Sequence, residues 1–450
     1  MAIQSLNPYS GELLREFTPL TELELTQKIA FARKKHFIWK EFDYPQRAQF
    51  LRLLAGFLER RKGDLAKLMA VEMGKLYTEG VAEIEKCVFV CNYYADNGAT
   101  FLADEQLEDG YVMYEPLGVV LGVMPWNFPF WQVMRFAAPA LMAGNTILLK
   151  HASNVPQCAI ALEDAFNEVK FPPAVFQSLL IGSDMVERVV RDPAVRAVSL
   201  TGSEVAGSTV ARAAGESLKK CVLELGGSDP AIVMEDADLD LAVEQLVMSR
   251  ARNAGQSCIA AKRFIVHESV HDQFVMKFKS AMEKLRYGDP LSSETSLAPL
   301  ASASALERLE EQVVDSIHAG AKVVTGGKRY PGNGFGYQPT ILIGVNENMP
   351  VFNEEAFGPV AAVIKYGRLE DALALANKTK YGLGASIWSR NEVEAKRLVR
   401  RLDVGVIAIN KMVQSDPAFP FGGVKGSGYG RELGRHGILE FVNVKSVSVG

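Results

Sequence analysis

The sequence of 450 residues is poor in cysteine and carries no surplus of positive charge. Its five cysteines are too few, and odd in number, for a disulfide framework. We therefore expect a reducing, cytoplasmic compartment in which an important cysteine is reactive rather than bridged. A net charge of −4 offers no basic surface for a phosphate backbone, which argues against nucleic acid as a partner. The 48% of hydrophobic and 23% of charged residues are typical of a globular protein.

Long uninterrupted apolar runs are also missing. Residues 116–134 contain no charged side chain, but Pro116, Pro125 and Pro129 interrupt them and Asn127 lies near their centre. A membrane-spanning helix needs about 20 predominantly apolar residues, and repeated prolines would break it. We therefore expect a buried strand–turn–helix here and no membrane span. The N-terminus has no basic region followed by an apolar core, so we expect no signal peptide.

The hydrophobic pattern changes along the chain. Residues 21–75 repeat apolar side chains at helical spacing, whereas short strand-like runs alternate with helical stretches from residue 117 onward. A second alternating block begins near residues 225–230. Strands separated by helices predict a doubly wound, mainly parallel α/β sheet in each of two lobes. The last residues, LEFVNVKSVSVG, alternate like a half-buried strand that pairs with a distant segment or another subunit.

Three polar residues lie where the predicted strands or glycine-rich loops end. Cys258 follows the loop NAGQS and is either a displayed nucleophile or a small buried hydrophobe. Glu224 ends the run CVLEL and is either a general base with a raised pKa or a solvated carboxylate. Asn127, in PWNFP, either caps a turn or donates to a developing oxyanion. The open end of such a sheet is where ligands bind.

A fourth segment, residues 199–207, passes from a strand to a helix through Gly202 and Gly207. A helix N-terminus offers free N–H groups to phosphate. The usual G-x-G-x-x-G pattern is absent, however, and Glu204 places a negative charge beside Ser203 where phosphate would lie.

Taken together, the motifs PWNFP, TGSEVAG, ELGG, NAGQSC, EEAFGPV and PFGGVKGSGYGRE resemble the aldehyde dehydrogenase superfamily, in that family's order. The resemblance runs from about residue 7 to the last strand. It implies a Rossmann-type NAD(P)-binding lobe (1–98 and 117–226) and an α/β catalytic lobe (227–424). It also implies a β oligomerisation extension (99–116 and 437–450), and hence a homodimer or homotetramer.

The resemblance also implies residue roles. Cys258 matches the nucleophile, Glu224 the general base, and Asn127 the oxyanion donor together with the Cys258 backbone N–H. Thiolate attack on a small-molecule aldehyde, hydride transfer and hydrolysis of the thioester would follow. The positions matched to cofactor binding are Trp126, Lys150, Ser153, Gly202, Ser203, Glu204, Gly207, Leu225, Glu355 and Phe357.

One position indicates the cofactor. The family often has glutamate three residues after the ribose-binding lysine, where it repels a 2′-phosphate. Here Ser153 follows Lys150, so the resemblance implies NADP as the preferred cofactor, with NAD also usable.

Arg135, Arg252 and Ser415 match positions that bind the substrate carboxylate in succinate-semialdehyde dehydrogenases of the shorter bacterial branch. That branch commonly has arginine where Ala418 stands and glutamine where Arg252 stands, which we interpret as a relocated cation. The implied reaction is the oxidation of succinate semialdehyde to succinate. Another small or ω-carboxylated aldehyde, such as glutarate semialdehyde, and a non-catalytic scaffold are the alternatives.

Two metal-like patterns have simpler interpretations. His267-Glu268-x-x-His271 resembles a zinc-protease motif, but His267 ends a predicted strand, so the two rings should diverge. Cys87 and Cys91 are four apart on a helical stretch and are expected to pack in the core. We expect no metal. Ala260 stands where some relatives carry a second cysteine, so a local disulfide switch is not expected.

Overall fold

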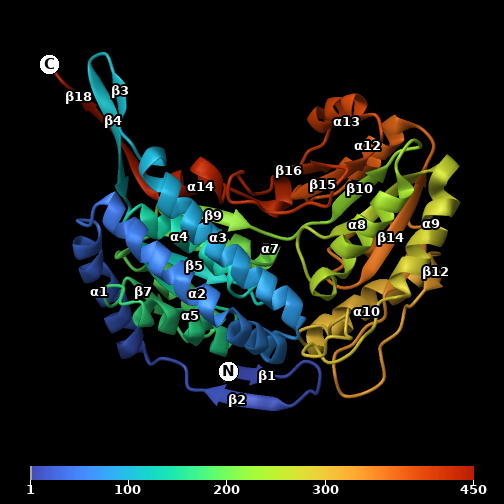
Figure 1. The fold of residues 1–450 in the computed structure, drawn as a ribbon, viewed down its shortest axis with the longest axis horizontal. Coiled ribbons are helices and arrows are strands. Elements are labelled where there is room, and N and C mark those ends of the chain that lie inside the picture. The colour runs from blue at the N-terminus through green and yellow to red at the C-terminus, as the bar shows by residue number, and fades with distance from the viewer. Residues whose placement is uncertain (1–2) are drawn as a thin grey trace.

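The computed structural model describes residues 3–450 and shows two α/β lobes side by side (Figure 1). The first lobe is built on a six-stranded sheet in the order β17-β9-β8-β5-β6-β7, which is parallel apart from the short edge strand β17. Its strands are β5 (Val119–Met124), β6 (Thr146–His151), β7 (Phe176–Ser178), β8 (Val195–Thr201), β9 (Lys220–Glu224) and β17 (Gly428–Tyr429). Its helices are α1 (Glu22–Trp39), α2 (Tyr44–Met73), α3 (Tyr77–Phe101), α4 (Trp131–Met142), α5 (Pro156–Glu168), α6 (Val186–Arg191) and α7 (Glu204–Glu216).

The second lobe has a seven-stranded sheet in the order β12-β13-β14-β11-β10-β15-β16, parallel except for β12. Its strands are β10 (Asp229–Val233), β11 (Ala261–His267), β12 (Lys322–Thr325), β13 (Thr340–Ile343), β14 (Val360–Tyr366), β15 (Gly384–Trp388) and β16 (Val406–Ile409). Its helices are α8 (Leu239–Ala251), α9 (Glu268–Met282), α10 (Ala303–His318), α11 (Pro350–Asn353), α12 (Leu369–Asn377) and α13 (Glu392–Leu398). The predicted α/β class with two sheets is confirmed.

A three-stranded antiparallel sheet, β18-β4-β3, extends away from the lobes (Figure 1). It contains β3 (Glu105–Leu107), β4 (Gly110–Pro116) and β18 (Val442–Ser448), and β18 follows α14 (Gly434–Leu439). The partner of the C-terminal strand is therefore β4 of the same chain. A separate hairpin, β1 (Ile3–Leu6) with β2 (Leu13–Phe17), lies near the N-terminus.

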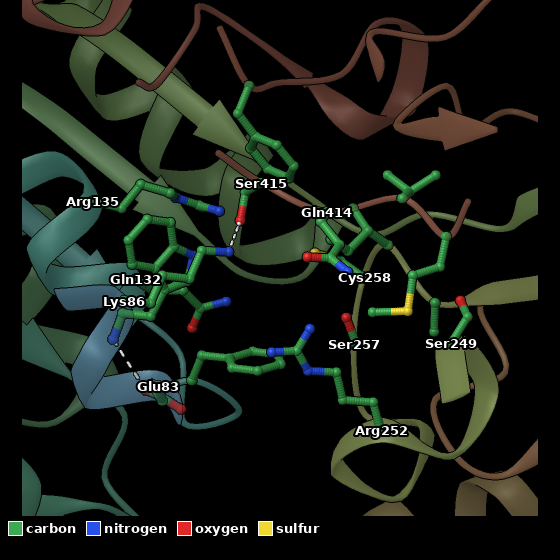
Figure 2. A pocket seen from close by; sticks show the side chains of 17 residues that line it. Glu83, Lys86, Gln132, Arg135, Ser249, Arg252, Ser257, Cys258, Gln414 and Ser415 are labelled. Carbon is green, nitrogen blue, oxygen red and sulfur yellow. Dashed lines mark hydrogen bonds between the residues drawn. The ribbon is translucent and has the colours of Figure 1, made fainter. Parts of the chain in front are cut away.

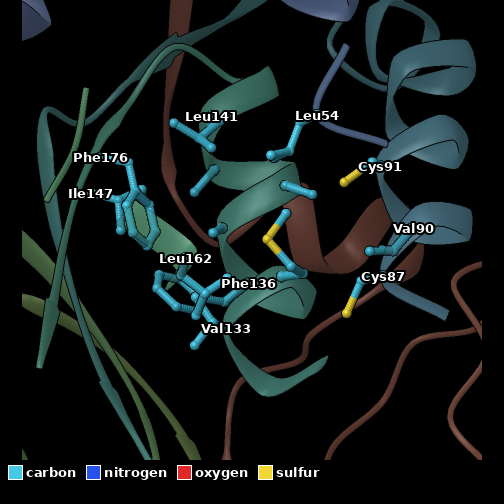
Figure 3. Close-up of a cluster of buried hydrophobic side chains, with 14 of the residues drawn as sticks. Leu54, Cys87, Val90, Cys91, Val133, Phe136, Leu141, Ile147, Leu162 and Phe176 are labelled. Carbon is cyan, nitrogen blue, oxygen red and sulfur yellow. The ribbon is translucent and has the colours of Figure 1, made fainter. Parts of the chain in front are cut away.

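The core of the first lobe surrounds α4, in which every residue is buried. Figure 3 shows Phe136 on the side of α4 that faces Ile147 and Phe176 of the sheet region, while Val90 and Cys91 of α3 lie on its opposite side. The apolar residues 116–134 thus form a strand, a turn and the start of a core helix, as predicted. Among residues 3–450, no helix has the length and apolar character needed to cross a membrane.

The two helical cysteines lie in this same core. Cys87 and Cys91 are fully buried on α3, which confirms the expectation of core packing. Burial raises the pKa of Cys91 to about 12, so its thiol stays protonated at neutral pH. Both side chains behave as small hydrophobes.

Candidate active site

A tightly wound loop between α8 and β11 presents Cys258. Asn253 and Ala254 both have a φ of 53°, and Gly255 has a φ of 76°. A Cβ on Gly255 would lie 2.3 Å from the backbone carbonyl of Gly358, so only glycine fits there. The NAGQS segment is therefore a constrained turn that holds Cys258 at the edge of the second sheet.

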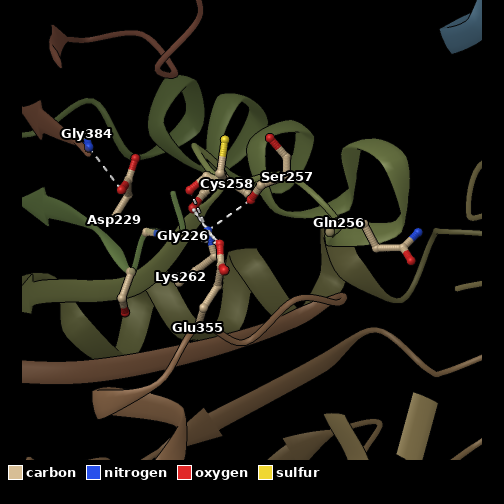
Figure 4. A network of polar contacts seen from close by, with 12 residues as sticks. Gly226, Asp229, Gln256, Ser257, Cys258, Lys262, Glu355 and Gly384 are labelled. Atoms are coloured by element: carbon tan, nitrogen blue, oxygen red, sulfur yellow. Dashed lines mark hydrogen bonds and ion pairs between the residues drawn. The ribbon is translucent and has the colours of Figure 1, made fainter. Parts of the chain in front are cut away.

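The buried side chain of Lys262 stabilises this loop through hydrogen bonds to its backbone (Figure 4). The Nζ of Lys262 donates to the backbone oxygens of Ser257 at 2.9 Å and Cys258 at 2.7 Å. It also lies 3.5 Å from Oε1 of Glu355, which accepts from the backbone N–H of Gly227 at 3.2 Å. The sequence prediction missed Lys262, although two adjacent cations, Lys262 and Arg263, at the start of a predicted strand are a signal that could have found it.

Two cavities meet at Cys258. A small cavity of about 50 Å³ lies on one side, and a cleft of about 690 Å³ lies on the other. Only Gln132 and Cys258 line both. A substrate entering from one side and a cofactor entering from the other would therefore meet at the thiol.

The surroundings of Cys258 favour the protonated thiol. Burial raises its pKa to about 12, and the positive charge of Arg135 opposes that shift only in part. The nucleophilic form is the thiolate, so a proton must leave before attack.

Glu224 is a buried carboxyl at the end of β9. Among residues 3–450, neither of its carboxylate oxygens has a hydrogen-bond partner. Burial raises its pKa well above the ordinary value, the negative charge of Glu432 raises it further, and Arg135 lowers it. It lines the large cleft together with Cys258. An unpaired carboxyl with a raised pKa has the properties of a general base.

The side chain of Asn127 is tied to the cysteine loop. Its Nδ2 donates to the backbone oxygen of Gln256 at 3.1 Å, while its own backbone oxygen accepts from Lys75 and Asn253, each at 2.8 Å. An amide nitrogen carries two hydrogens, so one remains for a further acceptor. Asn127 also lines the large cleft, on the same side of the thiol as Glu224.

Most residues predicted to bind the cofactor line the large cleft. These are Trp126, Gly202, Ser203, Glu204, Leu225, Glu355 and Phe357. The rings of Trp126 and Phe357 meet edge to face with centroids 5.8 Å apart. The charge of Glu204, which argued against phosphate binding, is compensated by Lys380 at 2.8 Å.

Three predicted cofactor residues lie outside the lining of this cleft. Lys150 is buried near the end of β6, opposite Val123 of β5, and Ser153 is exposed in the turn that follows. Gly207 lies inside the first turns of α7, where a Cβ would come within 2.6 Å of Leu225. This glycine therefore allows the helix to approach β9 closely, which brings the helix N-terminus to the cleft.

The three predicted substrate residues line the small cavity together (Figure 2). Arg135 and Ser415 are buried, and Arg252 is half-buried. The charge of Arg135 is already compensated, because its guanidinium forms an ion pair with Glu432. Its Nη2 also donates to Thr201 at 3.3 Å. The role of Arg135 toward a substrate carboxylate stays a prediction.

One cation that lines the small cavity, Lys86, was not predicted. Lys86 of α3 donates to Oγ of Ser415 at 2.7 Å (Figure 2). It follows Glu83 and Glu85 in a helical stretch, where a lysine is ordinarily interpreted as solvent-facing.

The zinc-like motif is split between two elements. His267 ends β11 and caps α9, where its side chain accepts from the backbone N–H of Ser269. His271 lies within the helix and contacts Asp272 at 2.7 Å. Within residues 3–450, no group of three or more His, Cys, Asp or Glu side chains is placed to hold a metal ion.

Comparisons with family models, curated sequences and solved structures all identify the same family. A family model described as "Aldehyde dehydrogenase family" matches residues 1–447. The chain is 48% identical over 451 residues to a probable NADP(+) succinate-semialdehyde dehydrogenase of Synechocystis sp., and 47% identical over 454 residues to an NADP(+) succinate-semialdehyde dehydrogenase of Mycobacterium bovis. Both alignments cover 99% of each chain. The crystal structure of succinic semialdehyde dehydrogenase from Streptococcus pyogenes with NADP+ superposes with a TM-score of 0.97 at 38% identity, covering 100% of both chains.

Proposed function

Because the chain belongs to the aldehyde dehydrogenase family, we propose that it oxidises succinate semialdehyde to succinate, with NADP as the preferred cofactor and NAD also usable. The observation that carries this proposal is the meeting of two cavities at Cys258, the smaller of which contains Arg135 and Arg252. The similarity to succinate-semialdehyde dehydrogenases over the full chain supports the same substrate.

The residues of the large cleft fit a dinucleotide. Its volume of about 690 Å³ lies within the range of small-molecule and cofactor sites. The N-terminus of α7, with Gly202 and Ser203 at its start, offers backbone N–H groups to a pyrophosphate. Lys150 and Ser153 would hold the adenosine ribose and accept the 2′-phosphate. When bound, NADP accepts the hydride.

The chain's own residues supply the rest of the reaction. The Cys258 thiol first releases its proton to water in the cleft, and the thiolate then attacks the aldehyde carbon. The Asn127 amide and the Cys258 backbone N–H stabilise the oxygen of the resulting thiohemiacetal. Loss of hydride leaves a thioester on Cys258. Glu224, in its deprotonated form, takes a proton from the water that hydrolyses this thioester, and the acid and the free thiol result. The cleft-side position of Glu224 and its unpaired oxygens support this role.

We further propose the domain division 1–98 with 117–226, 227–424, and 99–116 with 437–450 for the cofactor lobe, the catalytic lobe and the oligomerisation strands. Exposed apolar side chains on the three-stranded sheet, Leu107 and Val444, support a homodimer or homotetramer. The low cysteine content supports a cytoplasmic location.

A panel of aldehydes assayed separately with NAD and NADP tests the proposal. Succinate semialdehyde should give the highest kcat/KM, above glutarate semialdehyde and above butanal, an uncharged aldehyde of similar length. A preference for butanal would remove the substrate assignment and leave an aldehyde dehydrogenase of another specificity. Failure to reduce either cofactor with any aldehyde would favour a non-catalytic scaffold.

A further inference from the structure

The side chain of Lys86 enters the small cavity from α3. Its Nζ donates to Oγ of Ser415 at 2.7 Å and lies 4.3 Å from the ring centre of Trp131 (Figure 2). Lysine prefers to place its ammonium in water, yet this one is half-buried beside an aromatic ring and a hydroxyl. Its placement therefore needs a reason beyond the packing of the helix.

The charges around the cavity are unevenly compensated. Glu83 lines the cavity, but Lys75 forms an ion pair with it and the backbone N–H groups of Phe130 and Trp131 donate to it. Its negative charge is thus already satisfied. The cavity has no other acidic residue in its lining.

Among the cations of the cavity, Arg135 is paired with Glu432. Lys86 and Arg252, by contrast, have no carboxylate within 4.0 Å in the part of the chain that the structure describes. Two cations without an ion-pair partner in a half-buried space favour an anionic ligand.

We propose that Lys86 is a specificity-determining residue, whose ammonium binds the carboxylate of the aldehyde substrate together with the hydroxyl of Ser415. This inference rests on the proposed function. The ammonium has three donors, of which one is used on Ser415. Because the Ser415 oxygen accepts from Lys86, its own hydrogen is free to point at a carboxylate oxygen. Lys86 thus both contacts the anion and orients the second donor.

The ionisation of Lys86 gives the site a pH dependence. Burial lowers its pKa to about 7; the positive charges of Arg252 and Arg135 lower it as well, while Cys87 and Asp416 act in the opposite direction. The protonated form, present below that pKa, is the one that binds an anion. Binding of a carboxylate then raises the pKa, so the anion binds with uptake of a proton. The KM for an anionic aldehyde should therefore rise as the pH increases above about 7. The KM for an uncharged aldehyde should not show this rise.

The test compares Lys86→Met, Lys86→Arg and Lys86→Gln with the wild type, using succinate semialdehyde and butanal. Lys67→Met, on the exposed side of α2, is the matched control. In Lys86→Met the ratio of kcat/KM for succinate semialdehyde to that for butanal should fall about 10- to 100-fold, chiefly through KM. The same ratio should fall similarly in Lys86→Gln. Lys86→Arg should keep most of the wild-type ratio.

The pH profile supplies the second measurement. The KM of the wild type for succinate semialdehyde should rise above about pH 7, and this rise should be weaker in Lys86→Arg, since a guanidinium stays charged. An unchanged substrate ratio in both neutral variants would overturn the role of Lys86. Equal losses for the two aldehydes would overturn it too, because they would indicate a structural role. If the wild type itself does not prefer succinate semialdehyde, the proposed function fails, and that result needs no variant.

Discussion

Replacing Glu224 with glutamine should separate the two halves of the reaction. The substitution keeps the size and shape of the side chain but removes the base that activates water for hydrolysis of the thioester. Hydride transfer precedes that step and does not need the carboxylate as an acceptor of the water's proton. A positioned general base contributes roughly 10²- to 10⁴-fold to a rate, which corresponds to about 3–5 kcal/mol of the barrier. Neither carboxylate oxygen of Glu224 has a hydrogen-bond partner among residues 3–450, so the carboxylate is available to accept the proton of the water.

Rapid mixing of the variant with NADP and succinate semialdehyde should show a burst of about one reduced cofactor per active site, followed by a much slower steady state. Glu216→Gln, at the far end of α7, serves as the control and should behave like the wild type. A steady-state rate within about 10-fold of the wild type, or a slow phase with no preceding burst, would refute the assignment of Glu224 as the base.

The raised pKa of Glu224 predicts two pH effects. In the wild type, deacylation should accelerate as the pH rises through that pKa, since only the carboxylate accepts a proton, and Glu224→Gln should lose this dependence. Because the folded-state pKa lies above the unfolded value, the neutral carboxyl contributes stability that is fully present below the unfolded pKa of about 4.5 and is lost as the pH rises through the folded value. Relative to the wild type, the variant's melting temperature should therefore increase with pH. A difference in melting temperature between variant and wild type that does not change with pH would contradict the burial of an ionisable Glu224.

Three further substitutions test the remaining roles. Cys258→Ala should abolish turnover yet bind cofactor normally by fluorescence titration, and appreciable steady-state oxidation would disprove the nucleophile. Ser153→Glu should weaken NADP binding by charge repulsion and leave NAD comparatively unaffected; an unchanged NADP-to-NAD preference would mean that Ser153 is not beside the ribose. Arg252→Ala should lower kcat/KM for succinate semialdehyde roughly 10- to 150-fold while changing that for butanal little, whereas equal losses would make Arg252 structural.

Local sequence patterns were sufficient to predict the class of the fold and to place Glu224 and Asn127 at strand ends as candidate site residues. Strand and helix periodicities are properties of neighbouring residues, so the alternation of elements and the end of each strand could be read without a structure. Glu224 ends β9 and Asn127 follows β5, as their neighbouring residues predicted. Parallel strands of one sheet end at the same edge, which is why such residues gather there.

Only the tertiary structure shows which charged side chains of the site form ion pairs. Arg135 and Glu432 lie on segments far apart in the chain, yet they form an ion pair. Of the two arginines that line the small cavity, Arg252 is therefore the one that has no ion pair among the described residues. No local pattern indicates such a contact, because it depends on how α4 packs against the segment before α14. The same holds for the pairing of β18 with β4.

Lys86 and Lys262 show most clearly which contacts the sequence could not predict. In the sequence, Lys86 follows Glu85 and Lys262 precedes Arg263, and exposure to solvent is the ordinary expectation for such charged neighbours. Their ammonium groups instead contact Ser415 and the backbone around Cys258. Periodicity tells which face of a helix or strand is apolar, but the partner that receives a long, flexible side chain is set by elements that only folding brings alongside it.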